Sequence, residues 1–167
     1  MSESSSSTNT LMVRDECGHF RQATDDQVLV AAREAVDRKM KREVSFANPW
    51  AMKEYLRAKL CGYEHEIFAV VFLDNRNRMI EYAEMFRGTI DKASVHLREV
   101  VKEALRFNAA AVVFAHNHPS GHAMPSNDDR AVTKQLKEAL LLVDVRALDH
   151  VIVAGNEVVS FAERGLM

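Results

Sequence analysis

The sequence predicts an α/β (α+β) fold in which helices flank one mixed β-sheet. Two continuous apolar runs, residues 67–73 and 109–115, have the length of strands that are buried on both faces. Segments with a 3.6-residue apolar period lie before, between and after these runs. The resulting order of strand, strand, helix, strand, helix, strand, strand is typical of a layered sandwich of helices and a sheet.

Length and composition limit the class of protein. A chain of 167 residues, 47% hydrophobic and 28% charged, suits one globular domain with a short appendage. The net charge of −2 gives no support for DNA binding, and the basic run 38–42 is typical of a solvated helix face. Cys17 and Cys61 are far apart, which indicates neither a disulfide framework nor a metal site. This cysteine usage favours a reducing cytoplasm. No apolar stretch has the length of a membrane span.

Three segments are expected along the chain. Residues 1–24 begin with a Ser-rich stretch that has no signal-peptide pattern, and should form a disordered or extended tail. Residues 25–48 should form a helical appendage, with Asp25 or Asp26 as its cap. The main domain should extend over residues 49–167.

The main domain should begin with a helix and a hairpin. Asn48 and Pro49 are a helix start signal, and this helix should end near Gly62. Turn residues 74–77 follow the first apolar run and lead into a second strand over residues 79–86. These two strands should therefore pair as a hairpin.

The second half of the domain should alternate helices and strands. Residues 92–107 predict an amphipathic helix before the second apolar run, and residues 126–143 predict another after it. Residues 147–154 and 157–161 should be two closing strands, joined by a tight turn at Gly155.

The residues that carry chemistry lie in one stretch directly after the second apolar run. His116 and His118 are two residues apart, so in an extended strand both imidazoles point to the same side. Asp129 follows eleven residues after His118 and could supply a third ligand. Two imidazoles and one carboxylate match the catalytic zinc sites that use three protein ligands and leave a fourth position to water.

Each of these residues also has a structural interpretation. An isolated His-x-His pair is usually structural or exposed, and Ser126 with Asp129 fits an acidic variant of the capping box. The two interpretations of Asp129 are compatible, because a capped helix start holds the carboxylate rigidly. His122 could be a fourth ligand, a substrate contact or an exposed residue. For His150, which follows Asp149 at a strand start, a structural hydrogen bond is favoured over a role behind the metal ligands.

A hydrolytic site also needs a group that transfers protons, and Glu64, Glu66, Glu81 and Glu84 are the candidates. Glu66 directly precedes the first apolar strand, which should neighbour the strand that ends at His116. A solvated glutamate at a strand start is the structural alternative.

The spacing His116-x-His118-x7-Ser126-x2-Asp129 resembles the JAMM metalloprotease signature. The text His116-Asn117-His118-Pro119-Ser120-Gly121, followed by Pro125-Ser126, is similar to the RadC branch of that superfamily. Further similarities are Arg87-Gly88-Thr89, Arg98-Glu99-Val100, Asp149-His150 and Ser160-Phe161. The resemblance covers roughly residues 50–167.

The resemblance implies a JAMM/MPN-like (cytidine-deaminase-like) fold with one Zn²⁺ ion. By similarity, the metal ligands would be His116, His118 and Asp129. Ser126 would hold the bound water or the oxyanion of the tetrahedral intermediate. An upstream glutamate would be the acid/base, with Glu66 as the best match and Glu84 as the second.

The expected function is that of a zinc-dependent peptidase or isopeptidase acting on an unidentified peptide or protein. Full-length RadC-like proteins usually carry a helix-hairpin-helix region associated with DNA binding, whereas residues 1–50 contain no Gly-rich hairpin. The alternative is a DNA-repair-associated accessory or interaction protein with a structural or vestigial zinc site. An exposed sheet edge or the 25–42 helix could support a homodimer. Base deamination is disfavoured because no Pro-Cys-x-x-Cys element is present.

Overall fold

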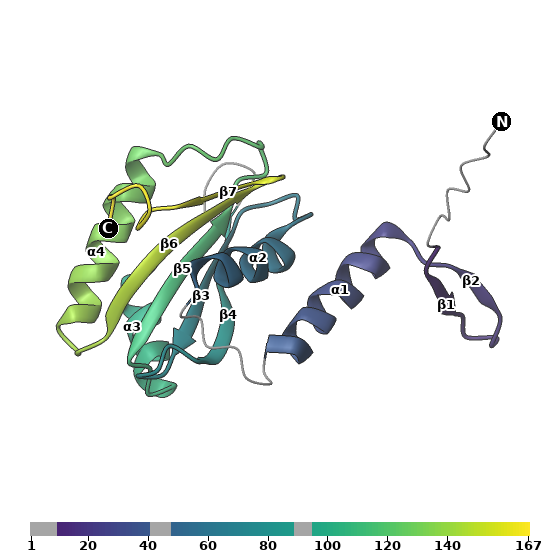
Figure 1. Cartoon of the computed structure of the whole chain (residues 1–167), viewed down its shortest axis with the longest axis horizontal. Coiled ribbons are helices and arrows are strands. Elements are labelled where there is room, and N and C mark those ends of the chain that lie inside the picture. Colours follow the sequence, from purple (N-terminus) through teal and green to yellow (C-terminus); the bar gives the residue numbers. More distant parts are fainter. Residues whose placement is uncertain (1–9, 41–47, 89–94) are drawn as a thin grey trace.

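The structure is a computed structural model that describes residues 10–40, 48–88 and 95–167. A five-stranded mixed sheet, with strand order β4-β3-β5-β6-β7, forms its centre (Figure 1). The strands are β3 (Ile67–Leu73), β4 (Met79–Arg87), β5 (Ala111–Asn117), β6 (Arg146–Ala154) and β7 (Glu157–Ser160). Strands β5 and β6 are parallel and the other neighbours are antiparallel, so the predicted mixed sheet is confirmed.

Helices cover both faces of this sheet. Helix α2 (Pro49–Leu60) packs on one face, and α3 (Leu97–Arg106) and α4 (Asn127–Leu141) pack on the other. Every residue of β3 and β5 is therefore buried, as their continuous apolar runs predict. Among the described residues, no helix combines the length and the apolar character needed to cross a membrane.

The helix start signals in the main domain act as predicted. The Asn48 side chain accepts a hydrogen bond of 2.9 Å from the Trp50 N–H, and Pro49 occupies the first turn of α2. Helix α2 ends before Gly62, whose φ of 82° suits glycine. Helix α3 begins at Leu97, later than predicted, and the predicted start over residues 92–94 lies outside the described residues.

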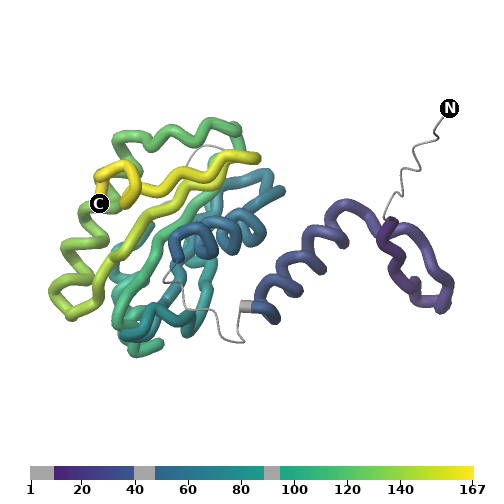
Figure 2. Tube along the Cα trace, viewed as in Figure 1, coloured from purple at the N-terminus to yellow at the C-terminus, as the bar shows by residue number. Residues whose placement is uncertain are grey.

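The N-terminal segment differs from its prediction. Residues 10–24 do not form a disordered or extended tail, because β1 (Met12–Arg14) and β2 (Phe20–Gln22) pair as a short antiparallel hairpin. The first nine residues of the predicted tail lie outside the described residues. Figure 2 shows the hairpin and helix α1 (Asp25–Met40) extending to one side of the sheet.

The cap of α1 also lies one residue earlier than predicted. The Thr24 hydroxyl accepts from the Gln27 N–H, and the Gln27 side chain accepts from the Thr24 N–H. This reciprocal pair is a capping box, so Thr24 is the capping residue in place of the predicted Asp25 or Asp26.

Polar contacts connect α1 to the end of α2. The Arg33 guanidinium donates to the carbonyl oxygens of Lys59 (3.1 Å) and Cys61 (2.6 Å), and it lies 4.2 Å from the centre of the Tyr63 ring. The Asp37 carboxylate accepts from Lys59 Nζ at 2.8 Å. Carbonyls at a helix C-terminus have no partner within the helix, so Arg33 both satisfies them and docks α1.

We predict that Arg33→Ala loosens α1 from the domain. Hydrogen bonds from charged groups contribute about 1.5–3 kcal/mol, so amide hydrogen exchange within α1 should rise about tenfold or more. Arg38→Ala on the same helix is the control, because the one contact of Arg38 with other described residues is an exposed pair with Glu34. Equal exchange in wild type and Arg33→Ala would contradict this account of docking.

Candidate metal centre

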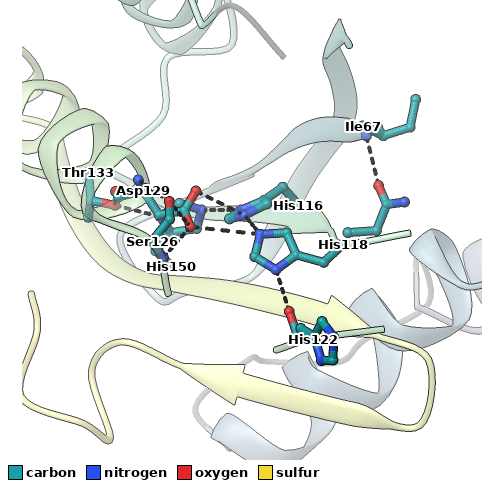
Figure 3. A network of polar contacts seen from close by, with 9 residues as sticks. Ile67, His116, His118, His122, Ser126, Asp129, Thr133 and His150 are labelled. Carbon is teal, nitrogen blue, oxygen red and sulfur yellow. Dashed lines mark hydrogen bonds and ion pairs between the residues drawn. The ribbon is translucent and has the colours of Figure 1, made fainter. Parts of the chain in front are cut away.

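Two histidines and one carboxylate meet where β5 ends and α4 begins (Figure 3). His116 is the last residue but one of strand β5 and is only 1% exposed. His118 follows the strand and donates its backbone N–H to the Val153 carbonyl, which fixes it beside β6. Asp129 lies in the first turn of α4. The structure therefore brings together three residues that are up to thirteen positions apart in the chain.

The atoms of these three side chains that could bind a metal ion lie close to one another. His116 Nε2 lies 2.9 Å from His118 Nε2 and 3.2 Å from Asp129 Oδ1, and His118 Nε2 lies 3.7 Å from Asp129 Oδ2. All three ligand atoms lie within 4.8 Å of one another. This group could hold one metal ion, as the His-x-His spacing predicts.

The carboxylate of Asp129 is held by the cap of its own helix. Asp129 Oδ2 accepts from the Ser126 N–H (2.7 Å) and from the Ser126 hydroxyl (2.6 Å), while the Asp129 N–H donates to Ser126 Oγ (3.0 Å). The predicted acidic capping box is confirmed. Because these bonds engage mainly Oδ2, Oδ1 is left to face His116.

A backbone carbonyl fixes the tautomer of His118. His118 Nδ1 lies 2.6 Å from the carbonyl oxygen of His122. A carbonyl only accepts, so we assign the ring proton to Nδ1, and Nε2 presents its lone pair to the group. His122 thus contributes its backbone oxygen, while the residue itself is exposed.

A longer chain of hydrogen bonds fixes the tautomer of His116. The Thr133 hydroxyl donates to the Asp129 carbonyl, so its oxygen is free to accept from His150 Nδ1. His150 Nε2 must then accept, and it lies 2.8 Å from His116 Nδ1. His116 therefore carries its proton on Nδ1 and, like His118, presents the lone pair of Nε2.

Burial supports the tautomer assigned to His150, and the neighbours of Asp129 favour its ionised form. Burial lowers the pKa of His150 well below its ordinary value, and His116 adds to the effect, so His150 is neutral with one donor and one acceptor nitrogen. Burial alone would raise the pKa of Asp129, but the interactions with His116 and Ser126 outweigh it and hold that pKa well below its usual range. Asp129 is therefore ionised at neutral pH.

The assigned tautomers leave two lone pairs and a carboxylate oxygen facing one another. Three electron-rich atoms at these distances repel unless a cation lies among them. A proton on one imidazole or a bound metal ion can supply that charge. The donor set of two imidazoles and one carboxylate is that of open catalytic zinc sites.

The four candidate glutamates lie on different sides of the sheet. Glu66 directly precedes β3. Phe68, two residues further along the chain, lies opposite His116 in the β3–β5 ladder. Glu84 lies opposite Ala69, on the face covered by α2. Glu81 lies opposite Phe72, and Glu64 is exposed before the sheet begins. None of the four belongs to the group of ligand atoms within the described residues.

The second-ranked glutamate is already engaged elsewhere. Glu84 Oε1 accepts from the hydroxyls of Tyr63 (3.0 Å) and Tyr82 (3.3 Å) on the α2 side of the sheet. Of the four glutamates, only Glu66 therefore meets both conditions. It lies at the end of β3 that is next to the C-terminal end of β5, and it is on the sheet face that carries His116.

Two residues at the centre were not among the predicted site residues. Thr133 completes the chain of bonds behind His116, and Asn117 bonds to the strand that follows Glu66. Thr133 lies four residues after Asp129 on α4, the spacing of neighbours on one helix face, which is the only sequence signal that could have indicated it. For His150, the role behind a ligand histidine is the interpretation that the geometry supports.

Comparisons with known proteins find similar sequences over most of the chain. The model of the RadC-like JAB domain family matches residues 46–166. A UPF0758 protein of Vibrio cholerae is 59% identical over 145 residues, which are 87% of this chain and 91% of that protein. A second, from Methylibium petroleiphilum, is 51% identical over 150 residues, or 90% and 68%. A third, from Cellvibrio japonicus, is 55% identical over 138 residues, or 83% and 62%. These names state no activity or substrate.

We predict that Thr133→Val weakens metal binding. Removing the hydroxyl leaves His150 Nδ1 without its acceptor, so the proton on His116 Nδ1 is no longer fixed. Loss of such a partner behind a ligand histidine typically lowers metal affinity about 10- to 100-fold. Zinc affinity measured by competition with a chromogenic chelator should show this loss, and Thr133→Ser should retain wild-type affinity. Identical affinities for Val and Thr at this position would refute the assigned chain of bonds.

Proposed function

Since the chain belongs to the RadC-like JAB domain family, we propose that it is a zinc-dependent metallohydrolase that cleaves peptide or isopeptide bonds. The observation that carries this proposal is the convergence of His116 Nε2, His118 Nε2 and an Asp129 oxygen within 4.8 Å. The assigned tautomers support it, because both imidazoles present lone pairs rather than protons.

The donor set fits zinc better than the common oxygen-binding cations. Calcium and magnesium prefer carboxylates, carbonyls and water, whereas two imidazoles and one carboxylate suit zinc. When bound, zinc acidifies water and polarises a carbonyl oxygen, which is the chemistry that amide hydrolysis needs. Three protein ligands leave room for a fourth, exchangeable one.

Glu66 is the residue that we assign to proton transfer. Residues two apart on a strand share a face, so Glu66 lies on the same face as Phe68 and hence as His116. Its carboxylate would take a proton from the attacking water and pass it to the nitrogen of the leaving amine. The engagement of Glu84 by two tyrosine hydroxyls supports this choice.

Ser126 has a structural task that supports the ligand set. Its hydroxyl proton is donated to Asp129 Oδ2, which orients the other carboxylate oxygen toward His116. Its expected contact with the oxyanion stays a prediction, because that contact would require the hydroxyl to turn away from Asp129.

A polypeptide substrate suits the way the site opens. The side chains of His118 and Asp129 are 17% and 14% exposed, whereas that of His116 is 1% exposed. Solvent therefore reaches the group from the side of His118 and the exposed loop 120–122. A flexible segment of another protein could approach an open coordination position from this side. The comparisons do not favour the DNA-repair-associated alternative, and the net charge gives it no support.

We predict that the purified protein binds about one zinc ion per chain, as the one three-ligand group found within the described residues requires. Metal analysis by mass spectrometry should show that His116→Ala loses this zinc. His122→Ala is the matched control, because the site uses only the backbone oxygen of His122 and should keep its metal. Zinc retained by His116→Ala, or lost from His122→Ala, would contradict the ligand assignment.

We predict that Glu66→Gln abolishes most cleavage while the zinc remains bound. General acid–base groups contribute about 10²- to 10⁴-fold to rate, so digestion of a peptide library should slow by at least about 100-fold. Glu84→Gln is the control and should leave the cleavage rate unchanged. Full activity in Glu66→Gln would remove this residue from the mechanism.

A further inference from the structure

Asn117 lies between the two histidines of the metal centre and makes two hydrogen bonds to another strand. Its side chain is buried at 3% exposure. The carbonyl oxygen Oδ1 accepts from the Ile67 N–H at 2.7 Å, a bond drawn in Figure 3. The amide Nδ2 donates to the His65 carbonyl at 2.9 Å. Because one partner only donates and the other only accepts, the orientation of this amide is fixed.

The two partners of Asn117 are the backbone groups on either side of Glu66. On the opposite side of the segment, the Glu66 carbonyl accepts from the Gly88 N–H at 2.8 Å. The peptide units around Glu66 are therefore hydrogen-bonded on both sides. On the β5 side the partner is the Asn117 side chain, and on the β4 side it is the backbone N–H of Gly88.

The side chain of Asn117 extends the sheet where the backbone ladder stops. The β3–β5 pairing ends with Phe68 opposite His116. After this last pair, the His118 N–H donates to the Val153 carbonyl of β6. The backbone of β5 is therefore no longer available to β3. The Asn117 amide replaces both missing partners, since it supplies one acceptor and one donor as a peptide unit would. Continuing the same register places Glu66 opposite His118.

We infer that Asn117 is a positioning residue that holds Glu66 at the metal centre through the backbone of residues 65–67. This inference rests on the proposed function, in which Glu66 transfers the proton. A catalytic carboxylate must be held to within about 0.5 Å of its productive position, which requires supporting packing and hydrogen bonds. Asn117 links that position directly to the strand that carries the first metal ligand.

Two variants of Asn117 separate positioning from metal binding. Asn117→Ala removes both bonds, and Asn117→Asp keeps the acceptor for Ile67 but cannot donate to the His65 carbonyl. A displacement of about 1 Å costs on the order of 100-fold in rate. Both variants should retain one zinc per chain and a KM near that of wild type, while kcat falls about 10- to 100-fold. Amide exchange at Ile67, followed by NMR, should rise in Asn117→Ala whether or not any substrate is cleaved.

A double-mutant cycle with Glu66→Gln tests whether Asn117 acts through that residue. Cleavage is followed over long incubations so that the residual rate of Glu66→Gln stays measurable. Adding Asn117→Ala to Glu66→Gln should cause no further loss of kcat. An equal loss in both backgrounds, or loss of zinc from Asn117→Asp, would overturn the inference.

A failure of the proposed function is distinguishable from a failure of the positioning role. A wild-type protein that binds zinc and cleaves nothing in the library would contradict the proposed function itself. Exchange at Ile67 then decides the positioning role alone: faster exchange in Asn117→Ala supports it, and unchanged exchange overturns it.

Discussion

The site depends on the position of β5 at the centre of the mixed sheet. Its antiparallel pairing with β3 brings the Glu66 segment alongside, and its parallel pairing with β6 places His150 behind His116. The connection from β5 to α4 returns Asp129 to the end of the same strand. Each group at the candidate metal centre therefore comes from β5 or from an element that is packed against it, and the candidate ligands inherit the rigidity of the core.

The buried polar side chains of the fold are concentrated at this point. Among the described residues, the buried polar or charged side chains are Lys59, His116, Asn117, Thr133, His150 and Ser160. Four of these six are the ligand histidine, its two supporting partners and the amide beside Glu66. Burying a polar group costs free energy unless it is hydrogen-bonded, and each of the four is. Such a network orients donor atoms more firmly than exposed side chains could.

The sequence predicted the strands, the main helices and the grouping of His116, His118 and Asp129 because each depends on local spacing. Apolar runs mark β3 and β5, and the capping box of Ser126 and Asp129 is contained within four residues. The β1–β2 hairpin was missed because its three-residue strands carry no clear period. Glu66 and Glu84 could not be separated either, because only the strand register tells which face of the sheet each one occupies. Asn117 and Thr133 were missed because their bonds join segments that are distant in the chain or depend on a neighbouring strand.

The most direct test of the metal centre is X-ray absorption at the zinc edge of the zinc-loaded protein. The account predicts two imidazole nitrogens and carboxylate or solvent oxygen at about 2.0–2.2 Å, with no sulfur. Asp129→Asn should change the oxygen part of this shell and leave both imidazoles in place. A shell with sulfur, with fewer than two imidazoles, or with no response to Asp129→Asn would contradict the three-ligand site.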